Sequence, residues 1–208
     1  MTLEERVIRL EDTEAIRYLQ AKYQRSLDTR DFDSLAECFA EDVVSSYGNG
    51  SMSYKGKDAV MEFLIGAMTP SMPSTHLIHG GEIDILSSYE AEAKWYLEDY
   101  LLHQKYKMKL HGAAIYEVKY IKLPAAQPAA GNSATAENSL AGAERVDGCR
   151  GWKISSIGYK RCYEYMEMRG HVNLITLGKK SFIKSLKEGG VARLGRYGAM
   201  FYNKWFRK

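Results

Sequence analysis

A long run of strict alternation, from Ala91 to Leu102, constrains the fold of this 208-residue chain more than any other feature. In a half-buried strand, successive side chains point to opposite faces, so apolar residues at every second position mark the buried face. One face of this run carries Ala91, Ala93, Trp95, Leu97 and Leu101, and the other carries Glu92, Lys94, Tyr96 and Glu98. The pattern predicts a long strand in a sheet that is covered on one side.

Asp99 breaks this pattern, because its position places it on the buried face with Trp95 and Leu97. A buried carboxylate is strongly unfavourable unless it has a partner or a function. Two structural explanations are open: a local bulge that reverses the alternation, or an ion pair within the core. The functional explanation is a polar group inside an otherwise apolar pocket.

The elements around this strand form two groups, with helices first and strands after them. Apolar residues at spacings of three and four predict a helix from about Leu10 to Leu27, with Asp12 or Thr13 as its N-cap. Two further helices are expected at Phe32 to Phe39 and Gly56 to Ala67, with short strands at Val43 to Tyr47 and Met52 to Tyr54. The other long strands are expected at His76 to Leu86, Lys107 to Leu123 and Gly151 to Tyr165.

Helices followed by a meander of long strands are typical of an α+β fold. Since the helices can cover only one face, we expect a cone-shaped, curved antiparallel sheet closed by three N-terminal helices, with a cavity in which Asp99 and Tyr23 meet. Residues 124–148 are rich in Ala, Pro and Gly without periodicity, which predicts an inserted hairpin loop. The main domain is then residues 1–170, and residues 171–208 form a C-terminal extension.

Composition argues against several classes of protein. A net charge of only +3 argues against a dedicated nucleic-acid binder. The sequence also has no run of about 18 apolar residues, the length needed to span a membrane. Three widely spaced cysteines, Cys38, Cys149 and Cys162, form no CxxC motif, and the start of the chain lacks the apolar segment of a secretion signal. We therefore expect a cytoplasmic protein.

The charge is unevenly distributed along the chain. Residues 179–208 hold nine Lys or Arg and a single acid, Glu188, together with several aromatic side chains. Such a tail is either a solvated segment or a surface for an anionic group, such as a coenzyme A thioester, an acidic partner or a membrane surface.

Six segments in a fixed order carry a family resemblance: Lys22–Asp28 (KYQRSLD), Ser45–Gly50 (SSYGNG), Thr75–Ile83 (THLIHGGEI), Lys94–Leu101 (KWYLEDYL), Gly112–Tyr120 (GAAIYEVKY) and Trp152–Tyr165 (WKISSIGYKRCYEY). Together they resemble the SnoaL-like branch of the nuclear-transport-factor-2-like superfamily. Within it the chain is most similar to the bile acid 7α-dehydratases and more distantly to the scytalone dehydratases. The resemblance implies a SnoaL-like, cystatin-like α+β barrel without a cofactor, assembled as a homotrimer or homodimer through the open sheet face.

The resemblance also places five residues at an active site: Tyr23, Asp28, His76, Asp99 and Arg161. Eliminating water requires a base for a C–H proton and an acid for the departing hydroxyl. Histidine is the natural base near neutral pH, so His76 is assigned as the base and Asp28 as the carboxylate that fixes its tautomer. His79 is a competitor, but the two histidines are three positions apart, so only one can face the cavity.

The remaining assignments each have a structural alternative. Tyr23 is interpreted as a hydroxyl donor to a substrate oxygen, although it could be a core tyrosine. Arg161 has the parity of apolar neighbours and needs a carboxylate, for which Asp99 is the candidate. That pair is either structural, or it tunes the base and binds substrate oxygen. We assign substrate contacts to Tyr47, Trp95, Tyr116 and Tyr159.

No spacing of histidines, cysteines or acids supports a metal site, and His103, His111 and His171 are expected to be structural or at the surface. The leading hypothesis is a cofactor-independent dehydratase that acts on a hydroxylated, oxo-activated polycyclic molecule, such as a steroid or bile acid. An isomerase or cyclase would use the same acid and base. A non-catalytic small-molecule-binding module is the third hypothesis, because folds of this kind host many functions.

Overall fold

The computed structural model describes residues 1–104, 107–124, 148–168 and 171–177. Most of the predicted insertion and most of the basic extension lie outside these ranges. The helices are α1 (Leu3–Thr29), α2 (Phe32–Ala36) and α3 (Lys57–Ala67), with a 3-10 turn, η1, at Gly48–Gly50. The strands are β1 (Phe39–Tyr47), β2 (Met52–Lys55), β3 (Ser74–Ile85), β4 (Glu90–His103), β5 (Met108–Lys122), β6 (Trp152–Met168) and β7 (His171–Leu177).

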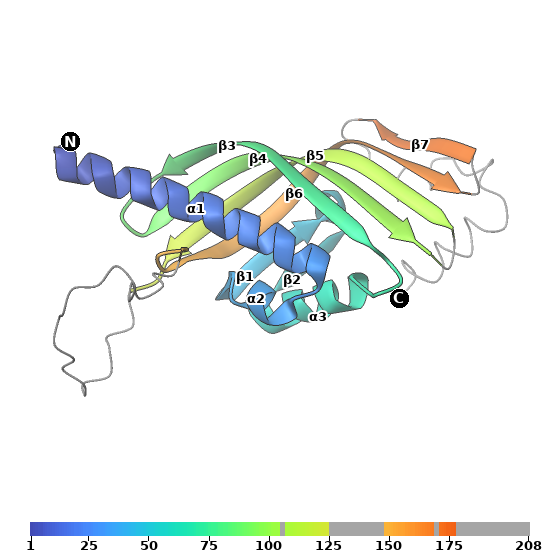
Figure 1. Cartoon of the computed structure of the whole chain (residues 1–208), viewed down its shortest axis with the longest axis horizontal. Coiled ribbons are helices and arrows are strands. Elements are labelled where there is room, and N and C mark those ends of the chain that lie inside the picture. Colours follow the sequence, from blue (N-terminus) through green and yellow to red (C-terminus); the bar gives the residue numbers. More distant parts are fainter. Residues whose placement is uncertain (105–106, 125–147, 169–170, 178–208) are drawn as a thin grey trace, which may run out of the picture.

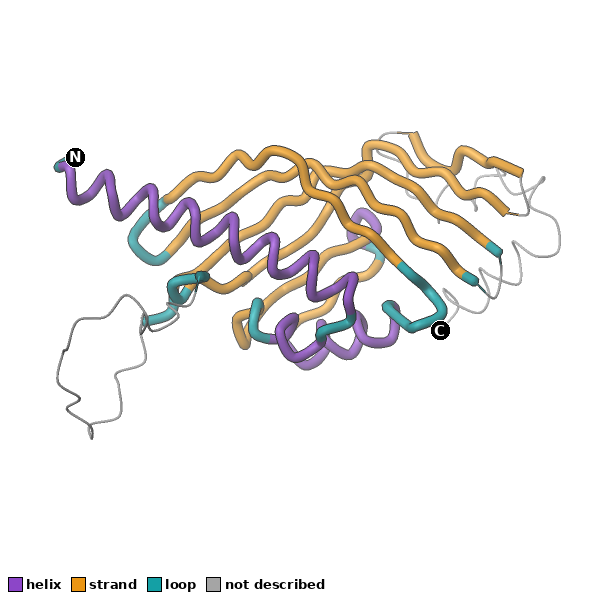
Figure 2. The backbone as a smooth tube through the Cα atoms, viewed as in Figure 1, coloured by secondary structure: helices purple, strands orange, loops and turns teal. Residues whose placement is uncertain are grey.

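The strands form one curved sheet in the order β2-β1-β6-β5-β4-β3, and β7 pairs with the second half of β6. Figure 1 shows α1 lying across one face of this sheet, with α2 and α3 next to β1 and β2. The backbone tube shows how long and bent the central strands are (Figure 2). The predicted α+β class, with helices packed on a curved sheet, is confirmed.

The prediction of a wholly antiparallel sheet is wrong at one place. β1 runs parallel to β6, with Val44 to Ser46 in register with Ser156 to Gly158. A tight hairpin forces antiparallel pairing, but β1 and β6 are far apart in the chain, so no turn sets their relative direction. The pairings β3–β4, β4–β5 and β5–β6 are antiparallel as predicted.

Helix α1 begins at Leu3, earlier than its apolar stripe predicts. A capping box starts it: the Thr2 hydroxyl accepts the Glu5 N–H at 3.1 Å, and the Glu5 carboxylate accepts the Thr2 N–H at 2.7 Å. The first turns are exposed and charged, so they lack the apolar periodicity on which the prediction depended. No helix in the described part of the chain is both long enough and apolar enough to cross a membrane.

Asp12, predicted as an N-cap, lies inside α1 and is buried at 2% exposure. Its carboxylate accepts hydrogen bonds from Lys122 Nζ at 2.6 Å and Trp152 Nε1 at 3.0 Å. Two turns further on, Gln20 Oε1 accepts the Tyr120 hydroxyl at 2.6 Å. Polar contacts therefore attach α1 to β5 and β6 in addition to the apolar core.

Gly112 in β5 leaves room for buried charged groups. Its register partners are Asp99 on β4 and Glu164 on β6. A Cβ atom on Gly112 would lie 2.7 Å from Arg161 Nη1 and 3.1 Å from Asp99 Oδ1, closer than packed atoms normally approach. The absence of a side chain here is therefore what lets the two charged groups meet.

We expect Gly112→Ala to lower the free energy of unfolding by about 1–3 kcal/mol, the usual cost of overpacking a filled interior. Gly66 in α3 provides a matched control, because no atom lies within 4 Å of a Cβ built there. Gly66→Ala should leave stability unchanged or raise it, since alanine favours helix. Chemical denaturation followed by tryptophan fluorescence measures both variants. If Gly112→Ala had the same free energy of unfolding as the parent protein, a methyl group would fit beside Arg161 and Asp99, and the close packing described here would be wrong.

Candidate active site

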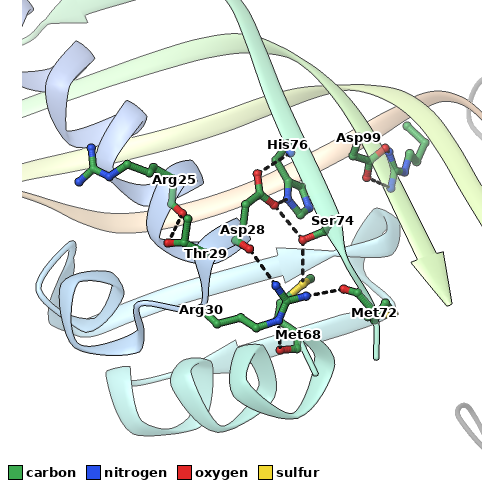
Figure 3. A network of polar contacts seen from close by, with 10 residues as sticks. Arg25, Asp28, Thr29, Arg30, Met68, Met72, Ser74, His76 and Asp99 are labelled. Atoms are coloured by element: carbon green, nitrogen blue, oxygen red, sulfur yellow. Dashed lines mark hydrogen bonds and ion pairs between the residues drawn. The ribbon is translucent and has the colours of Figure 1, made fainter. Parts of the chain in front are cut away.

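Asp28 and His76 form a buried pair between the end of α1 and the start of β3 (Figure 3). Asp28 Oδ1 lies 2.6 Å from His76 Nδ1 and accepts the Ser74 hydroxyl at 2.8 Å, while Asp28 Oδ2 accepts the His76 backbone N–H at 2.7 Å. The side chains of Asp28 and His76 are 19% and 7% exposed. A carboxylate at this distance keeps the proton on Nδ1 and leaves a lone pair on Nε2, as a general base requires.

The same contacts determine the ionisation of Asp28. Burial alone would raise the pKa of this carboxyl, but the hydrogen bonds and charge of the His76 imidazole, with the His76 N–H and the Ser74 hydroxyl, lower the pKa below its ordinary 3.8. Asp28 is therefore ionised at neutral pH and is suited to stabilise an imidazolium on His76.

Replacing this carboxylate should change acid stability. Because the folded-state pKa of Asp28 lies below 3.8, its ionised form stabilises the fold fully above that value, and this contribution is lost as the pH falls through the lower folded-state pKa. We expect Asp28→Asn to have a lower free energy of unfolding than the parent at about pH 5. This difference in free energy should become smaller toward about pH 2.5.

Urea denaturation across this range measures the gap. The exposed Asp42 on β1 provides a control, because Asp42→Asn removes one charge without breaking a buried pair. A gap between parent and Asp28→Asn that stayed constant with pH would contradict the predicted role of the ionised carboxylate.

His79, the competing histidine, lies on the opposite face of β3. Its side chain is 59% exposed, and its Nε2 lies 3.5 Å from Glu98 Oε2. Of the two histidines, His76 is the one that faces the helices and meets Asp28. The parity of the strand predicted that only one of them could do so.

Asp99 is the direct cross-strand partner of His76. It is 3% exposed, and its Oδ1 and Oδ2 each lie 2.6 Å from a terminal nitrogen of Arg161, Nη1 and Nη2 respectively. The burial of β4 alternates through Asp99, so the local bulge considered for this strand is absent and the predicted ion pair is confirmed. In the view of Figure 3, His76 lies between Asp28 and Asp99.

Glu164 is a member of this cluster that the sequence analysis missed. It is 8% exposed, and its Oε2 lies 3.0 Å from Arg161 Nε. Burial alone would lower the pKa of Arg161, but the neighbouring Tyr159, Asp99 and Glu164 raise it, so the guanidinium stays charged. A register shift on β6, where Ala114 pairs with Arg161 but Ala113 with Tyr163, turns Glu164 inward. Strict alternation continued from Arg161 would instead place Glu164 on the outer face.

Four tyrosines lie on the same inner side as these charged groups. Tyr23 on α1 is 1% exposed, and burial, followed by the neighbouring Tyr116 and Tyr47, raises its pKa well above 10. Its hydroxyl is therefore neutral and can donate a hydrogen bond. Tyr159 stacks edge-on against Tyr116 with ring centroids 5.8 Å apart, and Arg161 lies 4.6 Å from the centre of the Tyr159 ring.

The Tyr47 hydroxyl is buried, which raises its pKa. Among the described residues it has no hydrogen-bond partner of normal geometry, although Tyr23 and Ser45 lie near enough to lower that pKa in part. A buried hydroxyl without a partner is unusual in a folded protein and needs an explanation. Trp95, also assigned to substrate contact, is the register partner of Tyr116 and donates its Nε1–H to the Tyr120 hydroxyl at 3.0 Å. The indole N–H of Trp95 is therefore already used in a hydrogen bond within the core.

A hollow of about 810 Å³ lies away from the Asp28–His76 pair. Most of its charged lining is at outward positions of β3 to β6: Glu82, Glu92, Lys94, Glu117, Lys119 and Lys160. It reaches Tyr159 and Arg161, but neither Asp28 nor His76 lines it. We do not identify this hollow with the site, and the cavity expected between helices and sheet stays a prediction.

The remaining histidines described by the structure lie outside the pair. His103 is buried at the end of β4, and His111 on β5 contacts Glu98 and the Tyr165 hydroxyl on the outer face, each at 2.8 Å. The side chain of His171 lies outside the described part of the structure. Within the described ranges, no group of three or more His, Cys, Asp or Glu is arranged to hold a metal ion.

Comparison with known proteins agrees with this architecture. At 20% identity, the chain resembles the crystal structure of a putative scytalone dehydratase from Novosphingobium aromaticivorans, with 84% of this chain and 97% of that one covered and a TM-score of 0.60. A type 2 hexachlorocyclohexane dehydrochlorinase, LinA, is 14% identical, with 82% and 93% covered and a TM-score of 0.59. The TM-scores show a shared fold and, at these identities, no more than that. A family model described as a SnoaL-like domain matches residues 8–126, more than half of the chain. The protein therefore belongs to the SnoaL-like family of the nuclear-transport-factor-2-like superfamily.

Proposed function

We propose that this protein is a cofactor-independent dehydratase, a carbon–oxygen lyase, that removes water from a hydroxylated, oxo-activated polycyclic substrate. The observation that carries the proposal is the 2.6 Å contact between Asp28 Oδ1 and His76 Nδ1 inside the fold, next to the buried Asp99. An imidazole backed by an ionised carboxylate is equipped to remove a proton from carbon.

In the proposed reaction, His76 Nε2 takes a proton from the carbon next to a substrate carbonyl. The electron pair of that C–H bond forms the new double bond, and the C–O bond to the hydroxyl group breaks. The leaving oxygen takes the proton now held on His76 Nε2 and departs as water, which returns the imidazole to its neutral form. Asp28 stabilises the imidazolium in between, and Tyr23 donates a hydrogen bond to the oxygen on which charge develops.

The surroundings of the pair favour a flat, largely uncharged substrate. The inner side carries aromatic rings from Tyr23, Tyr47, Tyr116 and Tyr159, and the Tyr47 hydroxyl, which makes no hydrogen bond of normal geometry within the described residues, is a candidate to contact a substrate oxygen. Arg161 is engaged by two carboxylates, so it is poorly placed to bind an anionic group. A steroid or bile-acid-like molecule has the expected shape, and kinship with bile acid 7α-dehydratases is part of the proposal. The two structural relatives are named for a dehydratase and a dehydrochlorinase, which also favours elimination chemistry.

The test is to incubate the protein with a panel of hydroxylated 3-oxo-steroids, free and linked to coenzyme A. A dehydratase produces new conjugated-enone absorbance together with a product lighter by one water. An isomerase or cyclase on the same substrates would change the absorbance without changing the mass. Binding without turnover of any compound, unaffected by substitution of His76, would favour a non-catalytic binding module.

A homotrimer or homodimer in the cytoplasm and a domain ending near residue 170 remain part of the same proposal. A role of the basic tail in binding coenzyme A concerns residues outside the described part of the structure.

A further inference from the structure

Arg30 occupies the junction at which α1 ends and the chain turns towards α2. We propose that Arg30 is a positioning residue that holds Asp28 against His76. The proposal rests on the proposed function, since it concerns the geometry of the pair that acts there as base and carboxylate.

The backbone of Arg30 is in an unusual conformation. It ends α1 with φ 61° and ψ 30°, in the left-handed region. Glycine is the common residue at such a position, because a side chain with a Cβ atom disfavours this conformation. An arginine here requires compensating contacts, and strained residues of this kind cluster at functional sites.

The guanidinium of Arg30 supplies those contacts, all of them to backbone carbonyl groups; Figure 3 shows the ones to Asp28, Met68 and Met72. Nη1 donates to Asp28 O at 2.9 Å, and Nη2 donates to Met72 O at 2.6 Å. Nε donates to both Met68 O, at 3.1 Å, and Thr69 O, at 3.2 Å. The planar fork of arginine makes this spread of contacts possible, and a lysine ammonium could not reproduce it.

These carbonyl groups belong to two segments that are distant in sequence. One is the end of α1, and the other is the connection from Met68 to Pro73, which leads from α3 into β3. On its other side this connection is held by β4, where the Leu102 N–H donates to Pro73 O at 2.9 Å. Arg30 therefore ties the helix end to the chain directly before Ser74.

The result is a closed ring of contacts around the pair. Asp28 is held through its carboxylate by Ser74 and His76, and through its carbonyl oxygen by Arg30, which reaches Met72 just ahead of them. Without the Arg30 guanidinium, the hydrogen bonds described between Asp28 and the start of β3 would be those of the Asp28 side chain alone. A misplacement of about 1 Å can cost about 100-fold in rate, so this second attachment matters for catalysis.

Arg30→Gly tests this role, because glycine adopts the left-handed conformation freely, so the backbone can stay in place while the side chain that carries the guanidinium is removed. Arg25→Ala is the matched control, since it removes an exposed arginine from the same helix. Two measurements on the full chain need no substrate. One is hydrogen exchange of the His76 amide, whose proton is held by Asp28. The other is nitrogen NMR of the His76 imidazole, which reports its tautomer.

We expect Arg30→Gly to speed exchange of the His76 amide by about tenfold or more, with the amide of Leu97 in β4 unchanged, and to reduce the Nδ1-protonated fraction of the ring. Once a substrate is identified, the kcat of Arg30→Gly should be about tenfold or more below that of the parent, while its KM stays within about twofold. Arg25→Ala should change none of these quantities.

Unchanged exchange and an unchanged imidazole tautomer in Arg30→Gly would overturn the proposal while leaving the dehydratase hypothesis intact. Altered exchange and tautomer in a protein whose His76 variants show no catalytic defect would support the positioning role and overturn the proposed function. The two failures are therefore distinguishable.

Discussion

A His76→Gln variant is expected to lose turnover by about 10²–10⁴-fold, the usual contribution of a general base, while it folds like the parent. Glutamine can still donate a hydrogen bond to Asp28 but has no nitrogen that takes up a proton near neutral pH. The enone assay with the substrate identified from the steroid panel measures the loss, and circular dichroism checks the fold.

His79→Gln provides the matched control for this experiment. It makes the same chemical change three residues away, at a side chain that is 59% exposed and points to the opposite face of β3. We expect it to retain the turnover of the parent. Full activity in His76→Gln would remove the base from the mechanism, and equal losses in both variants would point to damage to β3 instead.

Arg161→Met is expected to have the largest effect on stability, lowering the free energy of unfolding by about 3–5 kcal/mol. The variant would keep two buried carboxylates, Asp99 and Glu164, without the cation that they share. Their exposed fractions are 3% and 8%. Methionine has a comparable length and an apolar side chain, so little volume is lost. Urea denaturation at neutral pH measures the change.

Two controls separate charge from packing in that result. Lys160→Met, at the adjacent outward position on β6, removes the same charge from a solvated side chain and should change stability little. Combining Arg161→Met with Asp99→Asn and Glu164→Gln should recover part of the loss, because no charge then stays buried. An Arg161→Met protein within about 1 kcal/mol of the parent would contradict the assignment of the cluster as mutually dependent.

Regular alternation and helical periodicity were sufficient for most of the fold. The pattern of β4 placed Asp99 on the buried face, and the parity of β6 up to Arg161 placed its partner on the same face. Both inferences depend only on the two-residue period of a strand, which local sequence expresses directly.

The predictions were wrong or incomplete where the structure depends on more than the local pattern of residues. A register shift on β6 turns Glu164 inward, and no residue in the sequence marks the shift. The parallel pairing of β1 with β6 depends on the path of the whole chain. The charged first turns of α1 hide its true start, although Thr2 and Glu5 have the spacing of a capping box and could have located it.

The contact between Asp28 and His76 shows a different limit. Local patterns could place a carboxylate at the end of α1 and a histidine in β3, but the pairing of the two came from the family resemblance. The contacts of Arg30 were invisible for a related reason: they go to carbonyl oxygens, which every residue has, so no side-chain pattern records them.

The attachments of α1 also restrict how the molecule can open. Asp12 is hydrogen-bonded to Trp152, Gln20 to Tyr120 and Asp28 to His76, so the polar attachments are distributed along most of the length of the helix. An apolar surface alone would tolerate sliding, but a shift by one turn would sever every one of these bonds together. The long helix therefore cannot slide lengthwise over the sheet without losing these hydrogen bonds, so the entry of a substrate has to leave the axial position of α1 unchanged.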